Sequence, residues 1–205
     1  MQIRKFIVGP IGANCYVVWS EDSREGVMID PGGASPQIEE YIKENHIHIN
    51  KIVLTHGHFD HIGGLDEAKA LTGAPVYIAK DDADCLTSSG KNISTMMGQA
   101  KTFEPADVLM KDGDVISIDD KHQLTVMLTP GHTPGGCCLI GKEVVFTGDT
   151  LFYTSIGRTD FPGGDYQAII ASVKKLMTLD EHLKVLPGHG ENSEIGFERH
   201  NNPFI

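Results

Sequence analysis

The stretch T-H-G-H-F-D-H-I-G-G, residues 55–64, follows a short β-branched run over residues 51–55. Side chains that can donate a lone pair to a metal ion occupy four of its ten positions, namely His56, His58, Asp60 and His61. Apolar residues then recur at helical spacing until Gly73. A strand end is rigid enough to hold such side chains in place. The stretch therefore predicts metal ligands at the junction of a strand and a helix.

Three later turns have the same design. Each follows a predicted strand and places a ligand-type side chain beside glycine: Pro130-Gly131-His132-Thr133, Thr147-Gly148-Asp149-Thr150 and Pro187-Gly188-His189-Gly190. Glycine lets the chain bend sharply and approach an ion closely. Five of the ten histidines lie in these four turns, which random scatter would seldom produce. The other five are expected to have ordinary structural roles: His46, His48, His122, His182 and His200.

Predicted strands occur in groups with helices between them. The strands are expected at residues 3–8, 15–20, 26–30, 51–55, 74–79, 115–118, 124–128, 137–140, 144–147 and 185–186. Helices are expected after Ser35-Pro36, over residues 62–71, and from Tyr166 with Asp165 as its cap. No low-complexity linker divides the chain, so we expect a single domain over residues 1–205, with helices packed outside stacked sheets. Residues 80–112 are polar and fit either a mobile loop over a site or a simple connection.

Composition narrows the class of protein. Hydrophobic residues make up 40% and charged residues 22%, as in soluble globular proteins. No apolar run approaches the roughly 20 residues that span a bilayer, and the N-terminus lacks the pattern of a signal peptide. The four cysteines form no framework, because the adjacent Cys137 and Cys138 should point to opposite faces of a strand. These features favour a reduced, cytoplasmic setting without membrane contact.

The charge balance argues against a nucleic-acid partner. There are 17 basic and 28 acidic residues, a net charge of −11, and no Lys/Arg cluster. Such a chain repels phosphate backbones. A small anionic ligand is still compatible, because a metal centre sets the local potential in its own pocket.

The ordered motifs resemble a known family. H-x-H-x-D-H at 56–61, an isolated histidine, an aspartate in a G-D-T turn and a final histidine resemble the metallo-β-lactamase superfamily. Within it, P-G-H-T-P-G at 130–135, G-D-T-L-F at 148–152 and P-G-H-G at 187–190 are most similar to glyoxalase II (hydroxyacylglutathione hydrolase) and its short bacterial relatives. The resemblance covers nearly the whole chain. It implies an α/β (α+β) fold, an αββα sandwich of two mixed β-sheets flanked by helices.

The resemblance also implies a set of metal ligands. His56, His58 and His132 would hold one divalent ion, Asp60, His61 and His189 a second, and Asp149 would bridge both. Neutral imidazoles suit a zinc-like ion, and carboxylates suit a harder position. Zinc is the expected metal, with iron or manganese as alternatives.

The implied reaction is hydrolysis of a small-molecule thioester. In the resembling enzymes a metal-bridged hydroxide attacks the carbonyl of S-2-hydroxyacylglutathione, such as S-D-lactoylglutathione, and releases glutathione and D-lactate. Asp149, as the bridge, and Asp60, which could also shuttle protons, are the expected catalytic carboxylates.

Two departures bear on the substrate. Only 16 residues follow His189, so we expect no C-terminal helical domain of the kind that completes the glutathione site in full-length glyoxalase II. Where that family has lysine and tyrosine, this chain reads Gly157-Arg158-Thr159-Asp160. Arg158 is predicted to bind a substrate carboxylate, although a surface role fits it equally well. Arg199 is a weaker candidate.

Other activities belong to similar proteins. A persulfide dioxygenase would use one iron, held by the equivalents of His56, His132 and Asp149, and a hydrolase of another ester, thioester or lactone would keep both ions. A class B β-lactamase is disfavoured, since the best-known ones carry cysteine in place of Asp149 and commonly a signal peptide. RNA-processing relatives should show a basic surface. A binding protein with a degenerate site should have lost ligands, and none is lost here.

Overall fold

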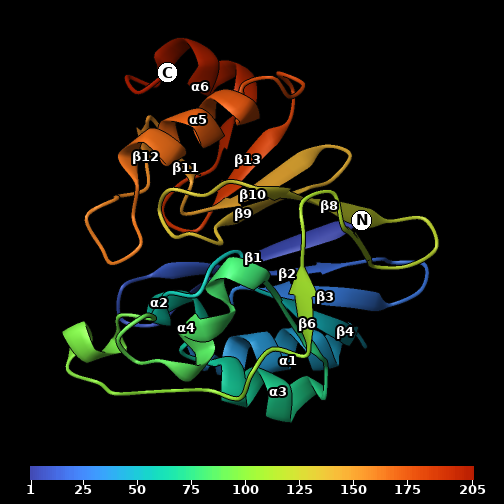
Figure 1. The fold of residues 1–205 in the computed structure, drawn as a ribbon. Helices are drawn as coiled ribbons and strands as arrows, with labels where there is room; N and C mark the ends of the chain where they lie inside the picture. The colour runs from blue at the N-terminus through green and yellow to red at the C-terminus, as the bar shows by residue number, and fades with distance from the viewer.

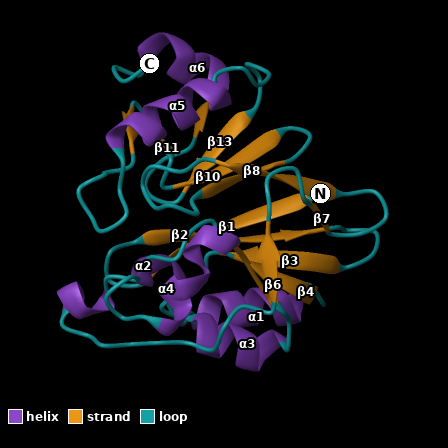
Figure 2. Cartoon of the chain, viewed as in Figure 1, coloured by secondary structure: helices purple, strands orange, loops and turns teal.

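Two six-stranded sheets lie face to face in the computed structural model, which describes residues 1–205 (Figure 1). The strand order is β1-β2-β3-β4-β5-β6 in the first sheet and β14-β13-β10-β9-β8-β7 in the second. Each sheet mixes parallel and antiparallel pairs; β3 to β6 are parallel in the first, and β10 and β13 in the second. Helices cover both outer faces (Figure 2). The predicted αββα sandwich is confirmed.

The bounds of the elements agree with most of the predicted ones to within a few residues. The first half contains β1 Gln2–Val8, β2 Ala13–Trp19, β3 Glu25–Ile29, α1 Pro36–Glu44, β4 His48–Val53, α2 Phe59–Ile62, α3 Leu65–Thr72, β5 Val76–Ala79, η1 Lys80–Asp82, α4 Ala83–Thr87, η2 Ser94–Met97 and β6 Val108–Met110. The second half contains β7 Val115–Ser117, β8 Gln123–Leu128, β9 Cys137–Ile140, β10 Val144–Gly148, β11 Leu151–Phe152, β12 Ser155–Ile156, α5 Tyr166–Leu176, β13 Lys184–Pro187, β14 Ser193–Glu194 and α6 Ile195–Asn201. None of the helices is long and apolar enough to cross a membrane.

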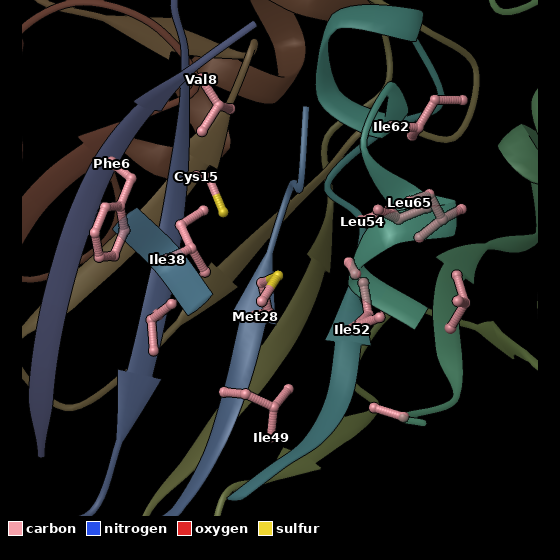
Figure 3. Close-up of a cluster of buried hydrophobic side chains, with 14 of the residues drawn as sticks. Phe6, Val8, Cys15, Met28, Ile38, Ile49, Ile52, Leu54, Ile62 and Leu65 are labelled. Atoms are coloured by element: carbon pink, nitrogen blue, oxygen red, sulfur yellow. The ribbon is translucent and has the colours of Figure 1, made fainter. Parts of the chain in front are cut away.

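Strand β2 shows how the core is layered. All seven of its residues are buried, and alternate side chains enter different clusters. Cys15 and Val17 join the cluster under helices α1 and α3 (Figure 3), whereas Tyr16 and Val18 enter the cluster between the sheets. A strand buried on both faces needs apolar residues at consecutive positions. This sequence provides them.

The outer face of the second sheet is covered by α5. Its apolar stripe, including Ile169 and Val173, packs on Cys138, while Cys137 faces the other sheet, as the adjacent pair predicts. Asp165 caps the helix, its side chain accepting a hydrogen bond from Ala168 N at 2.9 Å. Both predictions for this region are confirmed.

Residues 80–112 form a packed segment rather than a simple connection. They contain η1, α4 and η2, and they end in β6, which pairs with β5. The buried Asn92 fixes the segment internally, since its side-chain amide donates to the carbonyls of Cys85 and Lys101. Its own carbonyl accepts a hydrogen bond from Phe59 N at 2.8 Å. The segment therefore packs directly against the 55–64 stretch.

Candidate metal centre

Four loops carry the predicted ligands, and they meet at one end of the sandwich. The 55–64 stretch follows β4, His132 lies between β8 and β9, Asp149 follows β10, and His189 follows β13. Backbone hydrogen bonds join the two sheets here, from Cys137 N to Thr55 O at 2.9 Å and from Asn14 N to Gly188 O at 2.7 Å. Figure 1 shows α2, α4 and β11 at this same end. Residues up to 133 positions apart are thus held in one rigid frame.

Three histidines form the first part of the site, called here the three-histidine group: His56, His58 and His132. Their ligand-capable atoms lie within 4.8 Å of one another, and all three residues are buried. His58 Nδ1 lies 2.8 Å from His132 Nε2. The Nε2 atoms of His56 and His58 are buried and have no hydrogen-bond partner. Because buried polar atoms rarely stay unpaired, this arrangement fits ligands of a cation.

Asp60, His61 and His189 form the second part, called here the acidic group. His189 Nε2 lies 3.1 Å from Asp60 Oδ2 and 3.1 Å from His61 Nε2. Two imidazoles and a carboxylate facing one point are a suitable ligand set for a divalent cation.

Asp149 lies between the two groups. Its Oδ2 is 3.5 Å from His132 Nε2 and 3.6 Å from His189 Nε2, and its Oδ1 is 3.3 Å from His61 Nε2. Gly188 permits this placement, since a Cβ there would lie 2.2 Å from Asp149 Oδ1. The structure thus brings all seven predicted ligands together. Their division between two ions, with Asp149 as the bridge, remains a prediction.

Asp30 supports the site and is absent from the predicted residues. It is buried, and its carboxylate accepts hydrogen bonds from Thr55 N at 2.7 Å and Thr55 Oγ1 at 2.6 Å. His61 Nδ1, 3.0 Å away, donates to the same carboxylate, which turns Nε2 of that ring toward the site. Asp30 also lies within ligand distance of His56. The only sequence signal is the D-P-G-G motif at 30–33, which predicts a turn and not a contact.

A backbone carbonyl orients His132. Its Nδ1 donates to Arg158 O at 2.7 Å, so the lone pair of Nε2 points toward the other ligands.

Electrostatics distinguish the two groups. Burial lowers the pKa of His56 well below its usual value, and burial together with His132 lowers the pKa of His58 to about 3. Burial acts in the same direction on His61, but Asp149 and Asp60 outweigh it and hold the pKa of His61 well above its usual value. Burial lowers the pKa of His189 too, but its hydrogen bond to Asp60 and the charges of Asp149 and Asp60 together outweigh burial and raise that pKa. The first two histidines are therefore neutral, whereas the latter two keep their second proton to higher pH than usual.

A cavity of about 540 Å³ opens onto the ligands. Seven apolar side chains line it: Ile11, Ile93, Met96, Met97, Phe152, Ile156 and Phe161. They come from the β1–β2 turn, from η2 and its preceding residue, and from the segment that begins with β11. An apolar cavity with a few polar groups at one end is typical of a small-molecule site.

Arg158 also lines this cavity, but its charge is already paired. Its guanidinium donates to both carboxylate oxygens of Asp160 at 2.6 and 2.7 Å and lies 4.0 Å from the centre of the Phe161 ring. The predicted binding of a substrate carboxylate stays a prediction. Arg199 does not line the cavity, and the weaker prediction for it is wrong, because its Nη2 donates to Leu179 O at 2.9 Å within the C-terminal packing.

The family model described as "Metallo-beta-lactamase superfamily" matches residues 8–189. The chain belongs to this superfamily. Among its relatives, the probable metallo-hydrolase YqgX of Bacillus subtilis is 40% identical, over 100% of this chain and 98% of that protein. Hydroxyacylglutathione hydrolase GloC of Haemophilus influenzae is 33% identical, with the same shares covered.

Solved structures agree on the metallo-β-lactamase fold. BLEG-1 B3 metallo-β-lactamase superposes with a TM-score of 0.92 at 36% identity, covering 99% of both chains. TTHA1623, solved in a di-iron-bound form, gives 0.86 at 32% identity over 98% of this chain and 100% of that one. ETHE1 from Myxococcus xanthus gives 0.81 at 26% identity over 99% and 84%. Membership of the superfamily and the His/Asp cluster together indicate a metal-dependent hydrolase that takes divalent ions.

Proposed function

We propose that this protein is a two-metal thioester hydrolase that converts S-2-hydroxyacylglutathione, with S-D-lactoylglutathione as the substrate to test, to glutathione and a hydroxy acid. One observation carries the proposal: two groups of side chains that could each hold a metal ion lie on either side of Asp149, beside a cavity lined largely by apolar residues. The similarity to GloC supports the choice of substrate.

The ligand chemistry fits two divalent ions. The three-histidine group would hold one, the acidic group the other, and Asp149 would contact both. When bound, such ions supply a Lewis acid and a water that is acidic enough to act as a nucleophile near neutral pH. Zinc suits the three imidazoles, and the di-iron form of TTHA1623 supports iron as the alternative.

Asp60 has a position suited to proton transfer. It lines the cavity, and its Oδ2 lies 3.1 Å from His189 Nε2. Burial alone would raise its pKa, but His61 and His189 lower it below the usual value. The carboxylate is therefore ionised at neutral pH, so it can accept a proton released during hydrolysis and pass it to the departing thiolate.

The cavity wall would hold the rest of the substrate. Its apolar side chains exclude water from the reacting carbonyl, and Arg158 is the one cationic side chain among the lining residues other than histidine. A carboxylate of glutathione would have to compete with Asp160 for that guanidinium. Anion recognition here is thus weaker than an unpaired arginine would provide.

Two similar structures support other reactions. BLEG-1 is named as a B3 β-lactamase, and this favours β-lactam hydrolysis as the second candidate despite Asp149. The likeness to ETHE1 supports the persulfide dioxygenase alternative, in which a single iron would leave the acidic group without a role.

One set of assays separates these reactions. Protein purified without added metal is analysed for metals per chain, then tested for hydrolysis of S-D-lactoylglutathione, hydrolysis of a chromogenic cephalosporin, and oxygen uptake with glutathione persulfide. We expect two ions and thioester turnover as the fastest reaction. A single iron with persulfide-dependent oxygen uptake, or β-lactam turnover that exceeds thioester turnover, would overturn the proposal.

A further inference from the structure

One buried carboxylate beside the site has no place among the ligands. Asp82 ends η1 and has no exposed surface. It lies in the polar 80–112 tract, and the residue itself matches no motif. A buried carboxylate is costly unless it is well paired, so its partners show what it does.

Both oxygens of Asp82 bind ligand loops. Oδ2 accepts a hydrogen bond from Gly57 N at 2.9 Å, and Gly57 lies between His56 and His58. Oδ1 accepts one from Gly135 N at 2.6 Å, in the loop that carries His132. One carboxylate thus joins a loop of the first sheet to a loop of the second.

The two ligand loops pack directly against the segment that contains η1 and α4. A Cβ on Gly57 would lie 2.3 Å from Cys85 Cβ, and a Cβ on Gly135 would lie 2.5 Å from Asp82 N. Both loops therefore rest on η1 and α4. No lysine or arginine pairs with Asp82, and only the backbone amides, Thr133 and His132 oppose the rise in its pKa that burial causes. Its hydrogen-bond partners all belong to the two ligand loops.

We propose that Asp82 is a positioning residue for the three-histidine group, setting the separation between the His56–His58 pair and His132. It touches no ligand atom and is not a catalytic residue. The inference concerns retention of an ion and holds for any substrate, so it stands or falls separately from thioester hydrolysis.

The test is Asp82→Asn. The side-chain oxygen of asparagine can accept a hydrogen bond from only one of the two amides, Gly57 N or Gly135 N. Its NH₂ group then faces the other amide, which is also a donor, so the loop that carries this second glycine is no longer held. We expect one of the two bound ions to be held about 10- to 100-fold less tightly, the usual loss when a residue that supports a ligand is changed. Zinc titration against a chromophoric chelator measures this, and the absorption spectrum of the cobalt form reports the geometry.

The matched control is Asp84→Asn, two residues further on, where an exposed carboxylate pairs with Lys91 at 2.6 Å. This variant should bind both ions as the wild type does. Thermal unfolding of the metal-free proteins separates positioning from general stability. The proposal would be overturned if the Asp82→Asn protein is less stable without metal but binds both ions with wild-type affinity.

A second measurement keeps the proposal testable if Asp82→Asn does not fold. In metal-free wild-type protein, the amide protons of Gly57 and Gly135 should exchange with solvent slowly, because both amides donate hydrogen bonds to Asp82. Site-resolved hydrogen exchange measures this. Fast exchange at either glycine would show that the carboxylate does not hold that loop, which contradicts the inference.

Discussion

The three-histidine group and the acidic group face the same cavity but differ in charge and exposure. The three-histidine group is buried, and its His56 and His58 are kept neutral by burial. In the acidic group, the side chains of His189 and Asp60 are 24% and 12% exposed, and carboxylates raise the pKa of both histidines. A cation can bind the first group without displacing protons from His56 and His58. Binding to the second group displaces protons from His61 and His189. The two groups are therefore expected to bind a divalent ion with different dependence on pH.

The largest effect is expected for Asp149→Ala, because Asp149 alone faces both groups. Both ions should be lost, and thioester hydrolysis should fall by at least on the order of 10³-fold, because the ions supply the nucleophilic water and the Lewis acid. Metal analysis after dialysis checks the first claim. Unchanged metal content would contradict the bridging role of Asp149.

His189→Ala should separate the groups. It removes one ligand of the acidic group and leaves the three-histidine group intact, so one ion should be retained and the other held more weakly by roughly 10- to 100-fold or more. In a parallel metal titration, His58→Ala should weaken binding at the three-histidine group and leave the acidic group intact. If His189→Ala weakens both ions equally, the two groups do not act as separate sites.

The two groups should also differ in how their affinity for an ion depends on pH. Since the pKa of His61 and that of His189 are raised, their protons must leave before they bind an ion, so affinity at the acidic group should rise between pH 6 and 8. The expected slope is on the order of tenfold per pH unit for each proton displaced. In the three-histidine group, burial lowers the pKa of His56 and His58, so these two ligands release no proton when an ion binds and the dependence on pH should be weaker. Zinc titrations at three pH values measure both, and equal slopes would contradict the distinction.

The smallest effect is expected for the ion pair between Arg158, which lines the cavity, and Asp160. Asp160→Asn frees the Arg158 guanidinium, and so KM for S-D-lactoylglutathione should fall about two- to fivefold, a small change because the pair is exposed. An uncharged thioester serves as the control and should keep its KM. A fall for both substrates would mean that the variant acts by some route other than charge.

The seven candidate ligands could be recognised in the sequence because each of them lies within a local motif. Strand-end turns with glycine place His132, Asp149 and His189 through their nearest neighbours, and a strand buried on both faces, such as β2, is visible in its composition. The cap of α5 is equally local.

Residues that act over long range were not predictable in this way. Asp30 and Asp82 each bind amides of the 55–64 stretch from 25 positions away in sequence, and neither stands in a recognisable motif for such a contact. Strands β11 and β12 have two residues each, too few to show alternation. The cavity wall combines side chains from separate segments, such as Ile11 and Phe161, that only the fold brings together.

We predict that two ions bind to the two groups that share Asp149. Titration of metal-free wild-type protein with zinc at pH 7.5 or so, following bound metal and S-D-lactoylglutathione hydrolysis together, tests it most directly. We predict saturation at about two ions per chain, with full activity reached only as the second ion binds. Saturation at one ion per chain with full activity would show that hydrolysis does not need a second ion.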